Sequence, residues 1–267
     1  MNIILRELRA HLRSFLVWSA TMVFLIFAGM MKYGAFQKTG EAVNEIFDAL
    51  PEGLQVVMGM APGMDLTSVG VFYSIFYLYF LLLMSVHGTM LGASIIAKEE
   101  RDKTADFLFV KPLRRHRAIT AKIIAALVQI ILYNLVTGFA SILFVESLNT
   151  TGTPLGGPIF RLMGVLLAVQ FLFLGIGLFL GAFARSAERA SGLGTAVILG
   201  TFLLKVLIDL NKDLDPLRFL TPFEYFDSYE ILFRNTVPIP YLIVCILAAG
   251  MGIAGTYWFY HRRDLRC

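Results

Sequence analysis

The sequence predicts an all-α membrane protein with six transmembrane helices. Of its 267 residues, 57% are hydrophobic and only 16% are charged, whereas soluble domains carry roughly 45–50% apolar and about 25% charged residues. The apolar residues gather in stretches of about 17–29 residues, which are long enough to cross a hydrocarbon core of ~30 Å. Lysine and arginine are concentrated in alternate connections between these stretches, as expected for a chain that crosses a membrane several times.

We expect one transmembrane domain over residues 1–267. The spans are predicted at residues 15–31, 69–97, 119–145, 162–183, 191–208 and 239–260. Before the first span, Arg6, Arg9 and Arg13 follow one another at spacings of three and four among apolar residues. This pattern is typical of an amphipathic interfacial helix over residues 1–13, and equally of a simple basic flank to the span.

The connection at residues 32–68 predicts a short amphipathic helix with Ile46 and Phe47 on its apolar face, followed by turns rich in Pro and Gly. In the second span, Tyr73, Tyr77 and Tyr79 lie near the end that follows this connection. Tyrosines at such positions favour anchoring at the membrane interface, and the alternative is that they line a path between helices.

The distribution of basic residues predicts the orientation of the chain. The N-terminus, residues 98–122, residues 184–190 and the C-terminal tail together carry 16 of the 23 lysines and arginines. Because short cytoplasmic segments are enriched in these residues, both termini are expected in the cytoplasm, with an even number of spans.

The connection between spans 2 and 3 is highly charged, but it contains four consecutive apolar residues at 107–110. Asp102 or Thr104 can cap the start of a helix here, and Pro112 disfavours its continuation beyond Lys111. An apolar cluster with a charged rim indicates a docking surface, and the alternative is a loop that packs against the lipid surface.

This connection resembles the corresponding loop of ABC-2 type exporter permeases. The residues that carry the resemblance are Glu99, Glu100, Thr104, Asp106, Phe107, Leu108, Pro112, Arg115 and Lys122. The chain departs from the family pattern at Lys103, where a glycine is usual. The resemblance implies that the segment forms a cytoplasmic coupling helix, which includes Val110 and fits a cleft of an ATPase subunit.

A second resemblance lies at residues 217–226, where Pro222, Phe223, Tyr225 and Phe226 match a "Pro-Phe-x-Tyr-Phe" element of the same family. This match implies short re-entrant outer helices between spans 5 and 6.

The resemblance as a whole implies the permease subunit of an ATP-driven exporter in a bacterial plasma membrane. The sequence has no G-x-x-x-x-G-K-[ST] phosphate loop, so ATP and Mg would be used by a separate ABC ATPase, and this chain is expected to bind no cofactor and to be no enzyme. Its expected partners are that ATPase, a second copy or a related permease, and the lipid bilayer, but no nucleic acid. The alternatives are an ATP-independent secondary transporter or channel, and a non-transporting sensor or scaffold.

Four polar residues inside the predicted spans are candidates for lining a polar cavity: His87, Gln129, Asn134 and Gln170. Polar residues at membrane depth usually face the protein interior. For His87 the alternative is a neutral side chain that bonds a neighbouring helix. Only this one of the four histidines lies in a span, so no metal site is expected.

Lys205 precedes Asp209 by one helical turn, which favours an ion pair between them over a substrate contact. Spans 4, 5 and 6 carry glycines that would let helices approach closely. These are Gly175, Gly177, Gly181, Gly192, Gly194, Gly200, Gly250, Gly252 and Gly255.

Overall fold

The structure is a computed structural model, and it describes residues 3–39, 42–58, 65–101, 115–184 and 186–262. In these ranges the chain forms helices and no strand. The helices are α1 (Ile3–Thr39), α2 (Ala42–Asp48), α3 (Glu52–Val57), α4 (Val69–Arg101), α6 (Arg115–Leu148), α7 (Gly156–Phe183), α8 (Ala187–Leu210), η1 (Lys212–Leu220), η2 (Pro222–Glu224), α9 (Ser228–Phe233) and α10 (Ile239–Arg262).

Six of these helices are long and apolar enough to cross a membrane: α1, α4, α6, α7, α8 and α10. Each predicted span falls within one of them, so the prediction of an all-α protein with six spanning helices is confirmed. The helices α1, α4 and α6 have 37, 33 and 34 residues. At 1.5 Å per residue they are about 50–55 Å long, so they extend well beyond a hydrocarbon core of ~30 Å.

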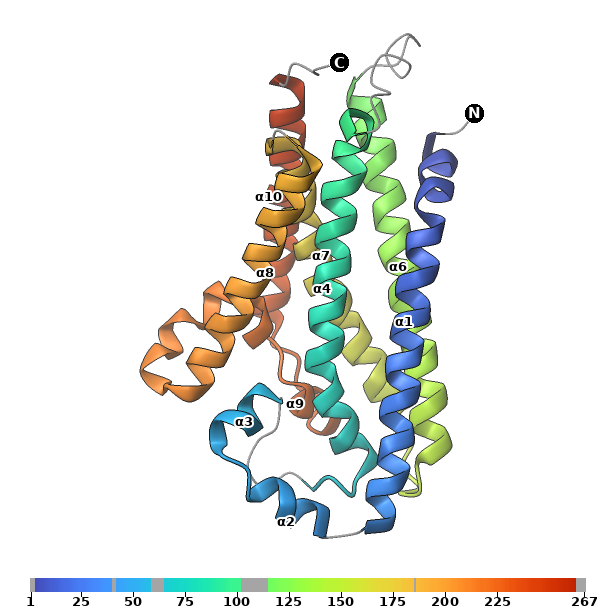
Figure 1. Cartoon of the computed structure of the whole chain (residues 1–267), viewed down its shortest axis with the longest axis vertical. Helices are drawn as coiled ribbons and strands as arrows, with labels where there is room; N and C mark the ends of the chain where they lie inside the picture. The colour runs from blue at the N-terminus through green and yellow to red at the C-terminus, as the bar shows by residue number, and fades with distance from the viewer. Residues whose placement is uncertain (1–2, 40–41, 59–64, 102–114, 185, 263–267) are drawn as a thin grey trace.

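The spans form one bundle in which α4 and α7 are the most buried and α8 and α10 the least. Helix α7 packs against both α4 and α10, α1 packs against α6, and α8 packs against α4 (Figure 1). The start of α1, the end of α4, the start of α6 and the end of α10 lie at the same end of the bundle (Figure 1). An even number of spans accounts for this arrangement.

Glycines in α7 allow two of these close contacts. A Cβ atom on Gly177 would overlap the backbone of Thr89 in α4, and a Cβ atom on Gly175 would lie 2.8 Å from Ala249 Cα in α10. Because lipid tails are as apolar as the side chains, close backbone packing replaces the hydrophobic effect as the force that joins such helices. By contrast, Gly192, Gly200 and Gly250 face open space in this chain, so the prediction of close packing is wrong for them.

The N-terminal residues differ from the predicted interfacial helix. Residues from Ile3 onward do not form a separate element, because α1 continues without a break to Thr39. No glycine or proline occurs between Ile3 and Ala28 to interrupt it. Glu7, moreover, is fully buried against the bundle instead of lying on a surface.

Helices α2, α3 and α9 lie toward the opposite end of the bundle (Figure 1). As expected, α2 includes Ile46 and Phe47, and η1, η2 and α9 connect α8 to α10. Helix α9 packs against α4 and α7. Tyr73 and Tyr77 are buried in the core, so interface anchoring is wrong for these two; only Tyr79 of the three is exposed.

Candidate functional site

Three of the predicted ATPase-coupling residues lie at the ends of α4 and α6. Glu99 and Glu100 belong to the last turn of α4, and Arg115 is the first residue of α6. The others lie outside the described residues: Thr104, Asp106, Phe107, Leu108, Val110 and Pro112. The structure therefore describes the two helix ends that this segment joins.

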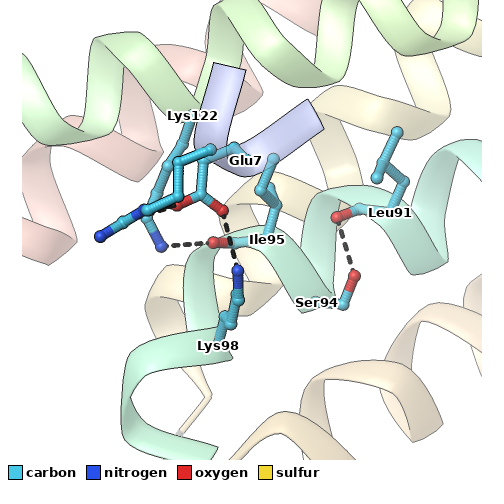
Figure 2. Close-up of polar contacts among 7 residues, drawn as sticks. Glu7, Leu91, Ser94, Ile95, Lys98 and Lys122 are labelled. Atoms are coloured by element: carbon cyan, nitrogen blue, oxygen red, sulfur yellow. Dashed lines mark hydrogen bonds and ion pairs between the residues drawn. The ribbon is translucent and has the colours of Figure 1, made fainter. Parts of the chain in front are cut away.

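A buried ion pair connects the end of α4 to α1. The Glu7 carboxylate accepts hydrogen bonds from Arg6 Nη2 at 2.7 Å and from Lys98 Nζ at 3.3 Å (Figure 2). Lys98 lies three residues before the end of α4. A buried carboxylate is stable only when it is paired, so this contact fixes the start of α1 against α4.

Lys122 adds α6 to the same contact. Its side chain is buried, and its Nζ donates to the Ile95 carbonyl oxygen of α4 at 2.5 Å (Figure 2). Lys122 also lies close enough to Glu7 for their charges to attract each other. We refer to Arg6, Glu7, Lys98 and Lys122 as the Glu7 cluster. It joins three helices close to where the segment at residues 102–114 begins and ends.

A second polar group lies near the middle of four spanning helices. It consists of Trp18 from α1, His87 from α4, Tyr133 from α6 and Gln170 from α7, and we call it the mid-span cluster. Gln170 Nε2 lies 3.3 Å from His87 Nδ1. The imidazole ring lies 4.5 Å from the Tyr133 ring and 5.5 Å from the Trp18 ring, measured between centroids. His87 and Gln170, two of the predicted cavity residues, are thus in contact.

The other two predicted cavity residues, Gln129 and Asn134, bind backbone atoms of neighbouring helices. Gln129 Nε2 donates to the His11 carbonyl oxygen at 3.1 Å, and Asn134 Nδ2 donates to the Met163 carbonyl oxygen at 3.0 Å. Both side chains are buried. In this structure they connect α6 to α1 and to α7.

The comparison with known families covers nearly the whole chain. The sequence model of the family described as "ABC-2 family transporter protein" matches residues 1–265. The chain belongs to the ABC-2 transporter family. A comparison with curated proteins finds no match. Together with its six spanning helices, membership identifies this ABC-2 protein as a multi-pass transmembrane component of a transporter, the kind of membrane subunit that is normally non-catalytic.

The second motif of this ABC-2 protein forms part of an ionic group at the end of α8. Lys205 Nζ binds Asp209 Oδ2, which confirms the predicted pair, and it also lies 3.4 Å from Glu224 Oε1 in η2. Arg218 Nε lies 3.6 Å from Glu224 Oε2. Phe223 packs against Phe173 of α7. The motif therefore holds η2 against the bundle by both ionic and aromatic contacts.

Sequence reasoning missed Glu7 and Tyr133 of this ABC-2 protein, which the structure places in the Glu7 cluster and the mid-span cluster. Glu7 is the only acidic residue among the three N-terminal arginines, which was a usable signal for a paired carboxylate. Tyr133 belongs to a stripe of four buried polar residues that are spaced four apart along α6. The stripe consists of Gln129, Tyr133, Thr137 and Ser141.

Proposed function

We propose that this ABC-2 protein is the permease subunit of an ATP-driven exporter. It works as a pair, formed by two copies or with a related permease, in a bacterial plasma membrane with both termini in the cytoplasm. A separate ABC ATPase binds ATP with Mg and supplies the energy. Closure of the ATPase subunits moves the segment at residues 102–114, and a rigid-body movement of the spans then exposes the substrate to the other side.

The Glu7 cluster is the observation that supports this proposal most directly. A force on the segment reaches the bundle through the ends of α4 and α6. Because Glu7 binds Lys98 and Lys122 binds the Ile95 carbonyl oxygen, α1 and α6 are both joined to the last turns of α4. Three spans therefore respond together to a displacement of the segment.

Co-purification tests whether the partner exists. A tagged chain solubilised in a mild detergent is expected to bring down an ATP-binding protein that has a phosphate loop. Recovery of the chain without such a protein, together with solute transport in the absence of ATP, would establish a secondary transporter or channel instead.

Substitutions in the apolar part of the segment test the coupling. Phe107→Asp and Leu108→Pro are expected to abolish ATP-dependent transport while the chain still inserts into the membrane, because they remove the surface that contacts the ATPase. Membrane fractionation, ATPase activity and export of the cell's substrate are measured for each variant. Thr151→Asp, in the exposed turn between α6 and α7, is the control. Wild-type transport in both segment variants would refute coupling through this surface.

A further inference from the structure

Two buried polar atoms in the mid-span cluster lack hydrogen-bond partners among the described residues. These are the Tyr133 hydroxyl oxygen and Gln170 Oε1, and both side chains have 0% of their surface exposed. The Gln170 amide uses only its nitrogen, which faces His87 Nδ1. If the amide were turned over, its nitrogen would be the end without a partner. Either orientation leaves one polar end of Gln170 unsatisfied.

Such atoms are expensive inside a protein. A buried donor or acceptor without a partner costs about 1–3 kcal/mol. Nearly all buried polar groups in proteins are therefore bonded to protein or to ordered water. The hydroxyl is a donor and the amide oxygen is an acceptor, and both belong to side chains that contact the His87 imidazole, yet the two atoms do not bond to each other. A molecule that both accepts and donates would satisfy both atoms at once.

We propose that the mid-span cluster is a buried water-binding site, in which water bridges Tyr133 and Gln170 beside His87. A bound water is typically held by about three polar partners, and Tyr133 and Gln170 offer two of them. A metal ion does not suit this site: no group of three or more His, Cys, Asp or Glu side chains able to hold one occurs in the described parts of the chain.

The polar residues nearest to Tyr133 are bonded to protein atoms, whereas Ser141, two turns further along α6, also lacks a partner among the described residues. Along the stripe on α6, Gln129 bonds the His11 carbonyl oxygen and Thr137 bonds the Tyr133 carbonyl oxygen at 2.9 Å. Asn134 bonds the Met163 carbonyl oxygen. These groups, one helical turn or less from Tyr133, are satisfied by protein atoms. The site is independent of the proposed coupling to an ATPase, since it depends only on contacts inside one chain.

Radiolytic footprinting of the purified chain in lipid nanodiscs tests the site directly. Hydroxyl radicals generated from a bound water oxidise the adjacent side chain even when it is buried. We expect oxidation of Tyr133 several-fold faster than that of Phe173, which is equally buried in the apolar core. In ¹⁸O-labelled water the product should carry ¹⁸O. Gln170→Leu should reduce the rate at Tyr133. Oxidation of Tyr133 no faster than that of Phe173 would overturn the proposal.

Thermal unfolding of Tyr133→Phe is an independent test, because the expected change in Tm differs between a site that holds water and a site that does not. Removal of the hydroxyl from a hydrated site loses bonds, so a lower Tm is expected. From a dry site the same change removes an unpaired group, so an unchanged or higher Tm would contradict the proposal. Tyr33→Phe shows how far Tm falls when a tyrosine hydrogen bond is lost, since Tyr33 Oη donates to the Thr67 carbonyl oxygen at 2.8 Å. Tyr79→Phe, at an exposed tyrosine, shows how far Tm changes when a hydroxyl is removed from the surface.

Discussion

Lys205 lies close to two carboxylates at the end of α8, Asp209 and Glu224, and Glu224 has a raised pKa. Burial, and then the hydrogen bond with Asp209, raise the pKa of Glu224 from its ordinary 4.5 to about 7, against the opposing charges of Lys205 and Arg218. Because the native state then binds a proton more tightly than the unfolded chain, stability falls as the pH rises from about 4.5 to about 7 and levels off above that.

Replacement of this carboxyl should remove that dependence. For Glu224→Gln we expect a smaller fall in Tm between pH 5 and pH 8 than for the unmodified protein, since no proton is released from residue 224. Differential scanning fluorimetry at several pH values measures the effect. Glu230→Gln is the control, because Glu230 forms an exposed pair with Arg234 in the same connection. Equal slopes for all three proteins would show that Glu224 does not carry a raised pKa.

Glu7 should be one of the most sensitive positions in the chain. Glu7→Gln leaves Lys98 and Lys122 without their counter-charge, and removal of one partner of a buried pair costs about 3–5 kcal/mol. We expect a loss somewhat below this range, because Lys98 is one-fifth exposed. Chemical or thermal unfolding in detergent measures it.

A double-mutant cycle separates the ion pair from other effects of the substitution. Adding Lys98→Gln to Glu7→Gln should recover part of the stability, since one unpaired ammonium is then absent. Arg9→Gln, at an exposed position on the same helix, should have little effect. Strict additivity of the Glu7 and Lys98 losses would mean that the two side chains do not interact.

Among the elements, α7 is the helix whose packing depends most on glycines. Gly177 and Gly92 meet across the α4–α7 contact: a Cβ on Gly92 would lie 2.6 Å from the Leu178 backbone nitrogen. Backbone atoms cannot move aside as the end of a flexible side chain can. A methyl group here must therefore push the two helices apart.

Gly177→Ala is consequently expected to destabilise the protein by about 1–3 kcal/mol, the usual cost of overpacking. Gly164→Ala is a matched control on the same helix, because nothing lies within 4 Å of its Cβ position; the better helix propensity of alanine should leave it neutral or slightly stabilising. Tm measurements on both variants test the contact. Equal Tm values for the two variants would contradict it.

At the scale of the whole molecule, the described helix ends show how the basic residues are distributed. The start of α1, the ends of α4 and α10 and the start of α6 share one end of the bundle (Figure 1), and most lysines and arginines belong to these regions of the sequence. If this end faces the cytoplasm, as we propose, the turn after α6 faces outward.

Cysteine labelling in intact cells tests that orientation. In a variant with Cys245→Ala and Cys267→Ser, Thr151→Cys should react with an impermeant maleimide from outside. His116→Cys should react only after the membrane is permeabilised. Both positions are exposed, so packing does not block the reagent. The reverse pattern of labelling would invert the proposed topology.

The sequence was sufficient for the spans because apolar length is a local property, and the pair of Lys205 with Asp209 follows from a spacing of four residues on one helix. It was insufficient wherever helices from distant parts of the chain meet. Nothing in the local pattern shows that Glu7 reaches Lys98, which lies 91 residues away. The burial of Tyr73 and Tyr77 likewise depends on neighbours that periodicity does not reveal.

The unbroken course of α1 gives the first helix the properties of a stiff rod. An α-helix of this length, about 55 Å, resists bending, and its first glycine is Gly29. A tilt about its middle would swing Ile3 and Thr39 in opposite directions. If the end of α1 that holds Glu7 moved in one direction, the end at Thr39 would therefore move in the opposite direction. Helices α2 and α3, which follow Thr39 on the far side of the bilayer, would move with it.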